Sequence, residues 1–187
     1  LSLTTVTGGD IVFNGNATVP TCFASVTLSA GGASITGPGA LFQNGATLTL
    51  SARDGIGAPG ACRLRIEDLC SPAFSPANLT ATSGVGGAGG IFLQFETDFN
   101  GTAVCADGGA GNVELAAGSG GMNLGTVQGL AVSLSSNNQI GDLNGVGVNN
   151  VSAGSSLDAN LSNAAGGSID LDVAAANISA TSAATGP

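Results

Sequence analysis

The chain repeats a short pattern in which apolar and polar residues alternate. The alternation occurs at residues 1–7, 24–30, 46–52 and 77–83, and it returns in the second half of the chain. A period of two is typical of a β-strand that buries one of its faces. We therefore expect these segments to be strands whose inward side chains form the core. The expected inward residues are Val26, Leu28, Leu48, Leu50, Leu79, Ala81, Val113, Leu115, Ile169, Leu171, Ile178 and Ala180.

A glycine-rich turn and a second apolar segment follow several of these strands, for example at residues 8–13 and 89–95. Leu3 precedes Val26 by 23 residues, and Val26 precedes Leu48 by 22 residues. Later intervals are longer, which we interpret as loop insertions. Repeats of this length predict a solenoid whose stacked coils share one continuous core. We expect an all-β fold, a parallel β-helix of roughly seven or eight coils.

A β-sandwich is the main alternative fold. It would need a hairpin turn at every step, and it does not explain why similar segments return at coil-like intervals. A helical fold is disfavoured because glycine is abundant and apolar residues lack helical spacing. Disorder is disfavoured because charged residues are few and the aliphatic residues alternate regularly.

Composition narrows the classes of function. The chain of 187 residues has no His and only three cations, Arg53, Arg63 and Arg65, against 12 carboxylates, for a formal net charge of −9. Three Arg side chains cannot form the cationic surface that nucleic acids require. Without His or Lys, the Ser-His-Asp triad, imidazole metal sites and Schiff-base chemistry are excluded. We expect no enzyme, catalytic residue, metal site, cofactor, nucleic-acid partner or membrane-spanning helix.

The alternating segments, the Gly-Gly turns and residues 54–57 resemble the repeats of filamentous-haemagglutinin-type adhesins of two-partner secretion and autotransporter systems. The resemblance is best over residues 1–57, 77–95 and 111–123. It implies a right-handed parallel β-helix, an extracellular or cell-surface location and a structural role in a fibre or adhesin stalk. Residues 58–76 depart from the simpler repeats of that family.

Two halves of this single solenoid unit look related, about residues 24–110 and residues 111–187 followed by 1–23. The correspondence matches Val26 with Val113. We hypothesise that the chain is one period of a longer array, either a covalent tandem repeat or a head-to-tail filament of copies. An open coil exposes unpaired backbone and apolar side chains, and neither end shows an amphipathic capping helix. The expected partners are therefore copies of the chain, with glycans or proteins of a host or neighbouring cell as further candidates.

The even number of cysteines suggests two disulfides in an extracellular chain. If residues 63–69 are extended, Cys62 and Cys70 lie about 26 Å apart, and a bridge needs Cα atoms within about 7 Å. This favours the pairs Cys22–Cys62 and Cys70–Cys105. If the segment is a loop, Cys62–Cys70 is the better pair, and free thiols are the third alternative.

Six Asn-x-Ser/Thr sequons are candidate glycosylation sites if the host glycosylates secreted proteins. They lie at Asn16, Asn78, Asn100, Asn150, Asn160 and Asn177.

A carbohydrate-active β-helix, acting as a polysaccharide lyase or hydrolase, is the alternative function. Such chemistry needs convergent carboxylates. Residues 63–68 form a mixed-charge cluster, and Asp170 and Asp172 are expected on one outward face of a strand. We interpret both as local ion pairs or solvated faces. A specific ligand would bind the inserted loops at 55–76 or 135–166.

Ice binding is a third function, because outward Thr and Ser columns would form a flat array. Carboxylates at residues 114, 170 and 172 are expected to interrupt it. The aligned pairs would be Thr27/Ser29, Thr49/Ser51, Thr80/Thr82 and Ser179/Thr181.

Overall fold

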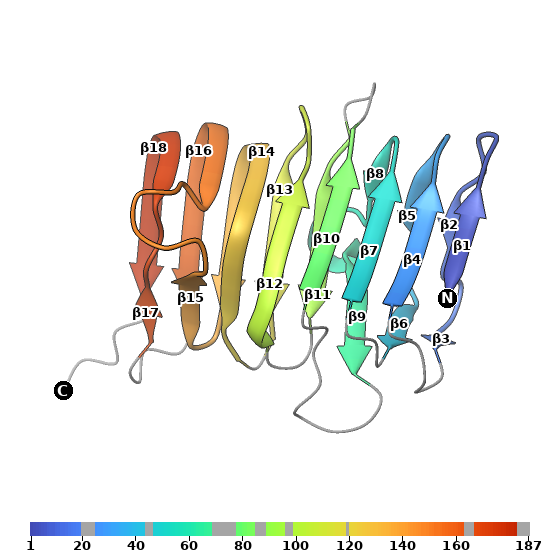
Figure 1. Cartoon of the computed structure of the whole chain (residues 1–187), viewed down its shortest axis with the longest axis horizontal. Helices are drawn as coiled ribbons and strands as arrows, with labels where there is room; N and C mark the ends of the chain where they lie inside the picture. Colours follow the sequence, from blue (N-terminus) through green and yellow to red (C-terminus); the bar gives the residue numbers. More distant parts are fainter. Residues whose placement is uncertain are drawn as a thin grey trace.

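The computed structural model shows a parallel β-solenoid, as the alternation predicts. All strand pairings are parallel and join 18 strands into one coiled sheet, with β1 at one end and β18 at the other (Figure 1). The described part of the chain contains one short 3₁₀-helix, η1 (Gly60–Cys62). The described residues are 1–19, 25–43, 47–68, 78–84, 89–95, 99–118, 120–162 and 167–182.

Eight strands stack along what we call the first face of the solenoid. They are β1 (Ser2–Thr5), β4 (Ser25–Ala30), β7 (Thr47–Ala52), β10 (Asn78–Ser83), β12 (Phe99–Asp107) and the first parts of β14 (Met122–Ser136), β16 (Val151–Leu161) and β18 (Val173–Ser182).

The second face continues from the first across a corner of each coil. It contains β2 (Ile11–Val12), β5 (Ser34–Thr36), β8 (Gly55–Ile56), β11 (Ile91–Phe95), β13 (Val113–Ala117) and the last parts of β14, β16 and β18. The remaining strands close the coils. They are β3 (Ala17–Thr18), β6 (Ala40–Gln43) and β9 (Leu64–Asp68) near the N-terminus, and β15 (Gln139–Asp142) and β17 (Ser168–Ile169) near the C-terminus.

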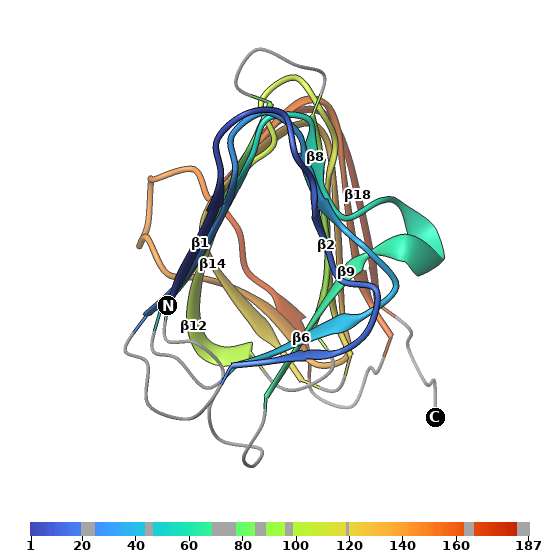
Figure 2. The ribbon, with the colours of Figure 1, turned by 90° about the vertical axis from the view of Figure 1, so that its right-hand side faces the viewer.

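The solenoid is right-handed. Seen from the N-terminal end, the chain rises along β1, crosses to β2 and descends, so that it runs clockwise while receding from the viewer (Figure 2). About six turns, those that begin with β4, β7, β10, β12, β14 and β16, have a neighbouring coil on both sides. This is slightly fewer than the seven or eight coils expected, and the coils that begin with β1 and β18 have a neighbour on one side only.

The core consists of the inward side chains that the alternation predicts. Val26, Leu48, Leu79 and Leu115 are fully buried. The expectation fails at the C-terminal end, where Ile178 is 61% exposed. This residue does lie in register with the core, but β18 is the last described coil and no described strand covers it.

Glycine lets neighbouring coils approach closely at the corners. A Cβ atom built on Gly39 would lie 2.1 Å from the carbonyl oxygen of Gly15 in the preceding coil. The amide of Gly39 also donates a hydrogen bond of 2.8 Å to the carbonyl oxygen of Phe13. A side chain at residue 39 is therefore incompatible with the observed spacing between these coils.

The expected correspondence of the two halves matches residues on different faces. Val26 lies in β4 on the first face, whereas Val113 lies in β13 on the second face. To superpose one half on the other, the first half would have to be shifted along the solenoid axis and also rotated about it, from the first face to the second. The hypothesis of two related halves stays a prediction in this form.

Candidate functional site

The two ends of the solenoid are the first candidate for a functional surface. Within the described chain, β1 pairs only with β4 and β18 pairs only with β16, so each has one unpaired edge. Leu1 and Leu3 are about half exposed at the N-terminal end, and Ile178 is exposed at the C-terminal end. Unpaired N–H and C=O groups beside apolar side chains form a template for another strand.

Columns of aliphatic side chains connect these two ends through the core. Each column contains residues that occupy the same register position on successive strands, and its last member at either end belongs to a terminal coil. The column of the first face is Leu3, Leu28, Leu50, Ala81, Ala106, Val127, Val151 and Val173. The column of the second face is Ile11, Ile35, Ile56, Ile91, Val113, Val132, Leu157 and Ile178.

The exposed loop at residues 143–150 is the second candidate. It lies between β15 and β16 and projects from the first face (Figure 2). It exposes three aliphatic side chains, those of Leu143, Val146 and Val148. The expected ligand-binding segment 135–166 thus contains β15, this loop and β16, and the loop carries its large exposed aliphatic side chains. In the other expected segment, 55–76, the structure describes β8, η1 and β9, while residues 69–76 lie outside the described part.

A buried asparagine holds the base of this loop. Asn150 is fully buried, and its amide nitrogen lies 3.0 Å from the carbonyl oxygen of Leu124 and 2.7 Å from Asp142 Oδ1. Its side-chain oxygen accepts a bond of 3.1 Å from the amide of Asp172. The carboxylate of Asp172 in turn accepts a bond of 2.7 Å from the amide of Gly147. The loop is therefore tied to three successive coils.

The same network shifts the titration of Asp142. The hydrogen bond from the Asn150 side chain is the largest cause that lowers the pKa of the Asp142 carboxyl below its ordinary value of 3.8. Partial desolvation raises the pKa, and hydrogen bonds from the amides of Asn144 and Gly145 lower it further. The carboxyl of Asp142 thus stays ionised in a structural role, as acceptor for the loop.

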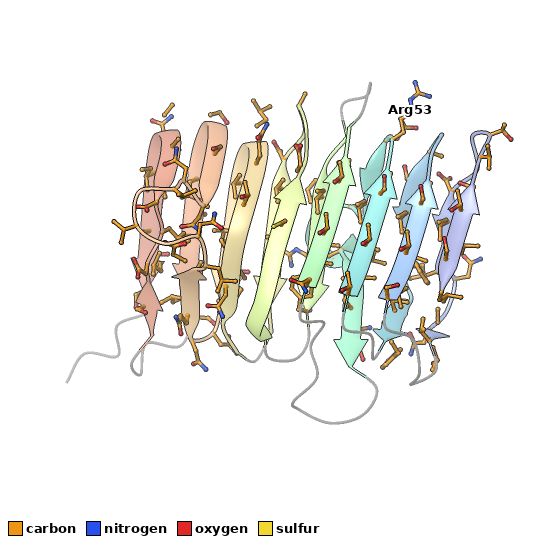
Figure 3. The ribbon with its side chains drawn as sticks, viewed as in Figure 1. Arg53 is labelled. Atoms are coloured by element: carbon orange, nitrogen blue, oxygen red, sulfur yellow. The ribbon has the colours of Figure 1, made fainter. Side chains whose placement is uncertain are left out.

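The charged residues form local ion pairs. Arg63 pairs with Glu114, and Arg65 pairs with Glu67 at 2.5 Å. Arg53 projects outward beyond the end of β7 (Figure 3), 3.8 Å from the carboxylate of Asp54. The pairing of Arg63 links the expected mixed-charge cluster to β13, a contact that the sequence spacing did not indicate.

The carboxylates expected to share a strand face do not. Asp170 and Asp172 follow β17 and precede β18, and their amides bond to the Ile140 carbonyl and the Asn150 side chain. Among the described residues, no group of three or more Cys, Asp or Glu side chains is placed to hold a metal ion.

Two shallow grooves follow the corner between the first and second faces. One has a volume of about 490 Å³ and the other about 370 Å³, and both include Leu130 and Ala110 in their lining. Asp54 is the one carboxylate in their lining, and glycines supply much of the rest.

The Thr and Ser columns are only partly as expected. Thr27, Thr49 and Thr80 lie in register on β4, β7 and β10, beside the column of Ser29, Ser51 and Thr82. The expected fourth pair, Ser179/Thr181, is wrong, because it lies on the second face in register with Asp158/Asn160. The first-face columns continue instead into Cys105 and Asp107.

Cys62 and Cys105 are free thiols in the structure, the first exposed and the second half-buried. Their favoured partners, Cys22 and Cys70, lie outside the described residues, so the disulfide pairing stays a prediction.

The asparagines of the six sequons differ in their exposure to solvent. Asn16, Asn78, Asn160 and Asn177 are exposed. Asn150 is not accessible in the folded chain, because its side chain is buried and hydrogen-bonded. The side chain of Asn100 lies outside the described residues.

No family model, curated protein or solved structure matches the chain. Among the described residues, no helix is long and apolar enough to cross a membrane. The class that the fold defines is the parallel β-solenoid.

Proposed function

We propose that the chain is a structural unit of an extracellular fibre or adhesin stalk, in which copies stack head to tail. The observation that carries the proposal is the pair of open ends. Both β1 and β18 keep an unpaired edge in the described structure, and the aliphatic columns of the core run up to these edges. A parallel strand from a second copy would satisfy the backbone groups and cover the apolar side chains at once.

The mechanism is continuation of the sheet from copy to copy. Each joint would add a coil at the spacing of about 4.8 Å that separates strands within a sheet. The result is a stiff rod with one continuous core. The net charge of −9 and the small number of charged residues suit a soluble surface with little non-specific binding.

The location belongs to the same proposal. The resemblance to filamentous-haemagglutinin-type adhesins supports a secreted or cell-surface fibre, and the observed solenoid is the fold that this resemblance implies. The mass of the native polypeptide, measured under reducing and denaturing conditions, distinguishes a covalent tandem repeat from a filament of separate copies. A mass of many units supports a covalent tandem repeat, and the mass of one unit supports a filament of separate copies.

The test of stacking compares two aspartate variants by sedimentation velocity and electron microscopy. Ile178→Asp places a charge on the open C-terminal coil, whereas Leu130→Asp places one on a half-exposed side chain in the middle of the solenoid. We expect rods that lengthen with concentration for the unchanged chain and for Leu130→Asp, and short particles for Ile178→Asp. A chain that stays monomeric at all concentrations, or rods that are unaffected by Ile178→Asp, would contradict the proposal.

Ice binding is the second candidate, since six Thr and Ser side chains form two adjacent columns on β4, β7 and β10. The hydroxyl groups within each column are separated by the regular spacing between neighbouring strands, about 4.8 Å. Thermal hysteresis of the purified chain tests it, and freezing without any hysteresis at millimolar concentration would remove it.

A further inference from the structure

The register of the solenoid is continuous on two faces, and this fixes how another copy could join. On the first face, the core column starts at Leu3 and ends at Val173. On the second face, the column starts at Ile11 and ends at Ile178. A second copy that continued both columns would have one register only, because a shift of one residue turns inward side chains outward. A shift of two residues keeps them inward but no longer aligns the members of each column.

The two ends are different surfaces. At the N-terminal end, Ile11, Phe13 and Val19 are buried although their coil is terminal, so this open edge exposes little of the second-face core. At the C-terminal end, Val173 is half-buried and Ile178 is exposed, so the interior is open. The aliphatic side chains of Leu1 and Leu3, about half exposed, are available at the N-terminal end to cover that opening.

Charge also favours a joint between unlike ends. The C-terminal end carries Asp170 and Asp172, and all three cations of the chain lie between residues 53 and 65. Two C-terminal ends that met symmetrically would bring four carboxylates together without a described cation near them. A head-to-tail joint would face this end with an N-terminal coil whose one carboxylate is Asp10, so repulsion would be smaller.

We propose that the joint between copies repeats the internal register of the solenoid, with Ile178 of one copy beside Ile11 of the next. This inference rests on the proposed function and specifies its interface. The same register places Val173 beside Leu3, and it places the outward residue Ser179 beside the outward residue Val12. The filament is therefore polar, with every copy pointing in the same direction.

Cysteine cross-linking tests this register. In the variant Val12→Cys/Ser179→Cys, the two new thiols lie at opposite ends of one chain, so a disulfide between them must join two copies. Aligned residues on neighbouring strands are about 5 Å apart, within the range of a disulfide. In the control Val12→Cys/Thr181→Cys, the shift of two residues increases the separation to about 8 Å, beyond that range.

A second control calibrates the reaction inside one chain. Val12 and Thr36 are aligned on β2 and β5, so Val12→Cys/Thr36→Cys reports the rate for the same geometry within one molecule. The unsubstituted chain, oxidised in parallel, gives the products that the native cysteines form. Each sample is examined by electron microscopy before oxidation and by non-reducing electrophoresis after it.

We expect Val12→Cys/Ser179→Cys to give a ladder of covalent multimers at a rate within tenfold of the internal control, and the Thr181 variant to give at least tenfold less. Three results would overturn the proposed register but leave end-to-end assembly in place. In each of them filaments form, and the two variants give equal ladders, the Thr181 variant gives the stronger ladder, or neither variant gives a ladder. The absence of both filaments and ladders, with a normal internal control, overturns the proposed function as well.

Discussion

Replacement of Gly39 by alanine tests the close packing of coils at a corner. The new Cβ would lie 2.1 Å from the Gly15 carbonyl oxygen and 2.9 Å from the Phe13 carbonyl oxygen. Relief of the first contact requires a backbone shift of about 1 Å, and overpacking of this kind costs about 1–3 kcal/mol. The shift also weakens the hydrogen bond from the Gly39 amide to Phe13, which contributes about 1 kcal/mol. We expect Gly39→Ala to lower the free energy of unfolding by about 3 kcal/mol.

Gly15→Ala is the matched control, because a Cβ atom on Gly15 meets nothing within 4 Å. Reduced freedom of the unfolded chain should stabilise this variant by about 0.4–1 kcal/mol. Guanidinium denaturation followed by circular dichroism compares the variants, at a concentration where both are monomeric. A difference of less than about 0.5 kcal/mol between them would refute the argument that glycine at residue 39 sets the coil spacing.

Three further predictions concern the core and the loop. Leu50→Ala should cost about 2–5 kcal/mol in urea denaturation, because Leu50 is fully buried between Leu28 and Ala81, and a cost below about 1 kcal/mol would contradict this packing. Asn150→Ala should cost about 2–4 kcal/mol by the same assay, whereas the exposed Asn177→Ala should cost under about 1 kcal/mol, and equal costs would contradict the role of the buried amide. The pKa of Asp142 is lower in the folded chain than its ordinary value of 3.8. The ionised carboxyl therefore contributes its full stabilisation above pH 3.8, and this contribution is lost as the pH falls through the pKa of the folded state. Carbon NMR titration should show a pKa below 3.8 that moves toward 3.8 in Asn150→Ala, and an unchanged value in the variant would contradict the assigned cause.

The fold was predictable because burial in a solenoid follows the alternation of single strands. Residues such as Leu48 and Leu79 identified the core without any knowledge of which strands are neighbours. The alternation does not say which face of the coil a strand occupies. This is why Ser179 and Thr181 were expected beside Thr27 but lie on another face. It is also why Val26 and Val113 resemble each other in sequence and differ in position.

The candidate surfaces were less predictable, because they depend on what the structure leaves uncovered. Ile178 has the pattern of a core residue, and only its place in the last described coil exposes it. Asn150 was identified as a candidate glycosylation site, yet its partners Leu124 and Asp172 lie more than 20 residues away in sequence.

X-ray fibre diffraction from oriented assemblies measures whether the sheet continues from one copy to the next. Eight strands stack along the first face, and at a spacing of about 4.8 Å they predict an axial repeat of about 38 Å per copy. Continuation of the sheet across each joint predicts this repeat together with a sharp meridional reflection near 4.8 Å. An axial repeat several ångströms longer would show a gap at each joint and contradict end-to-end pairing of the backbone.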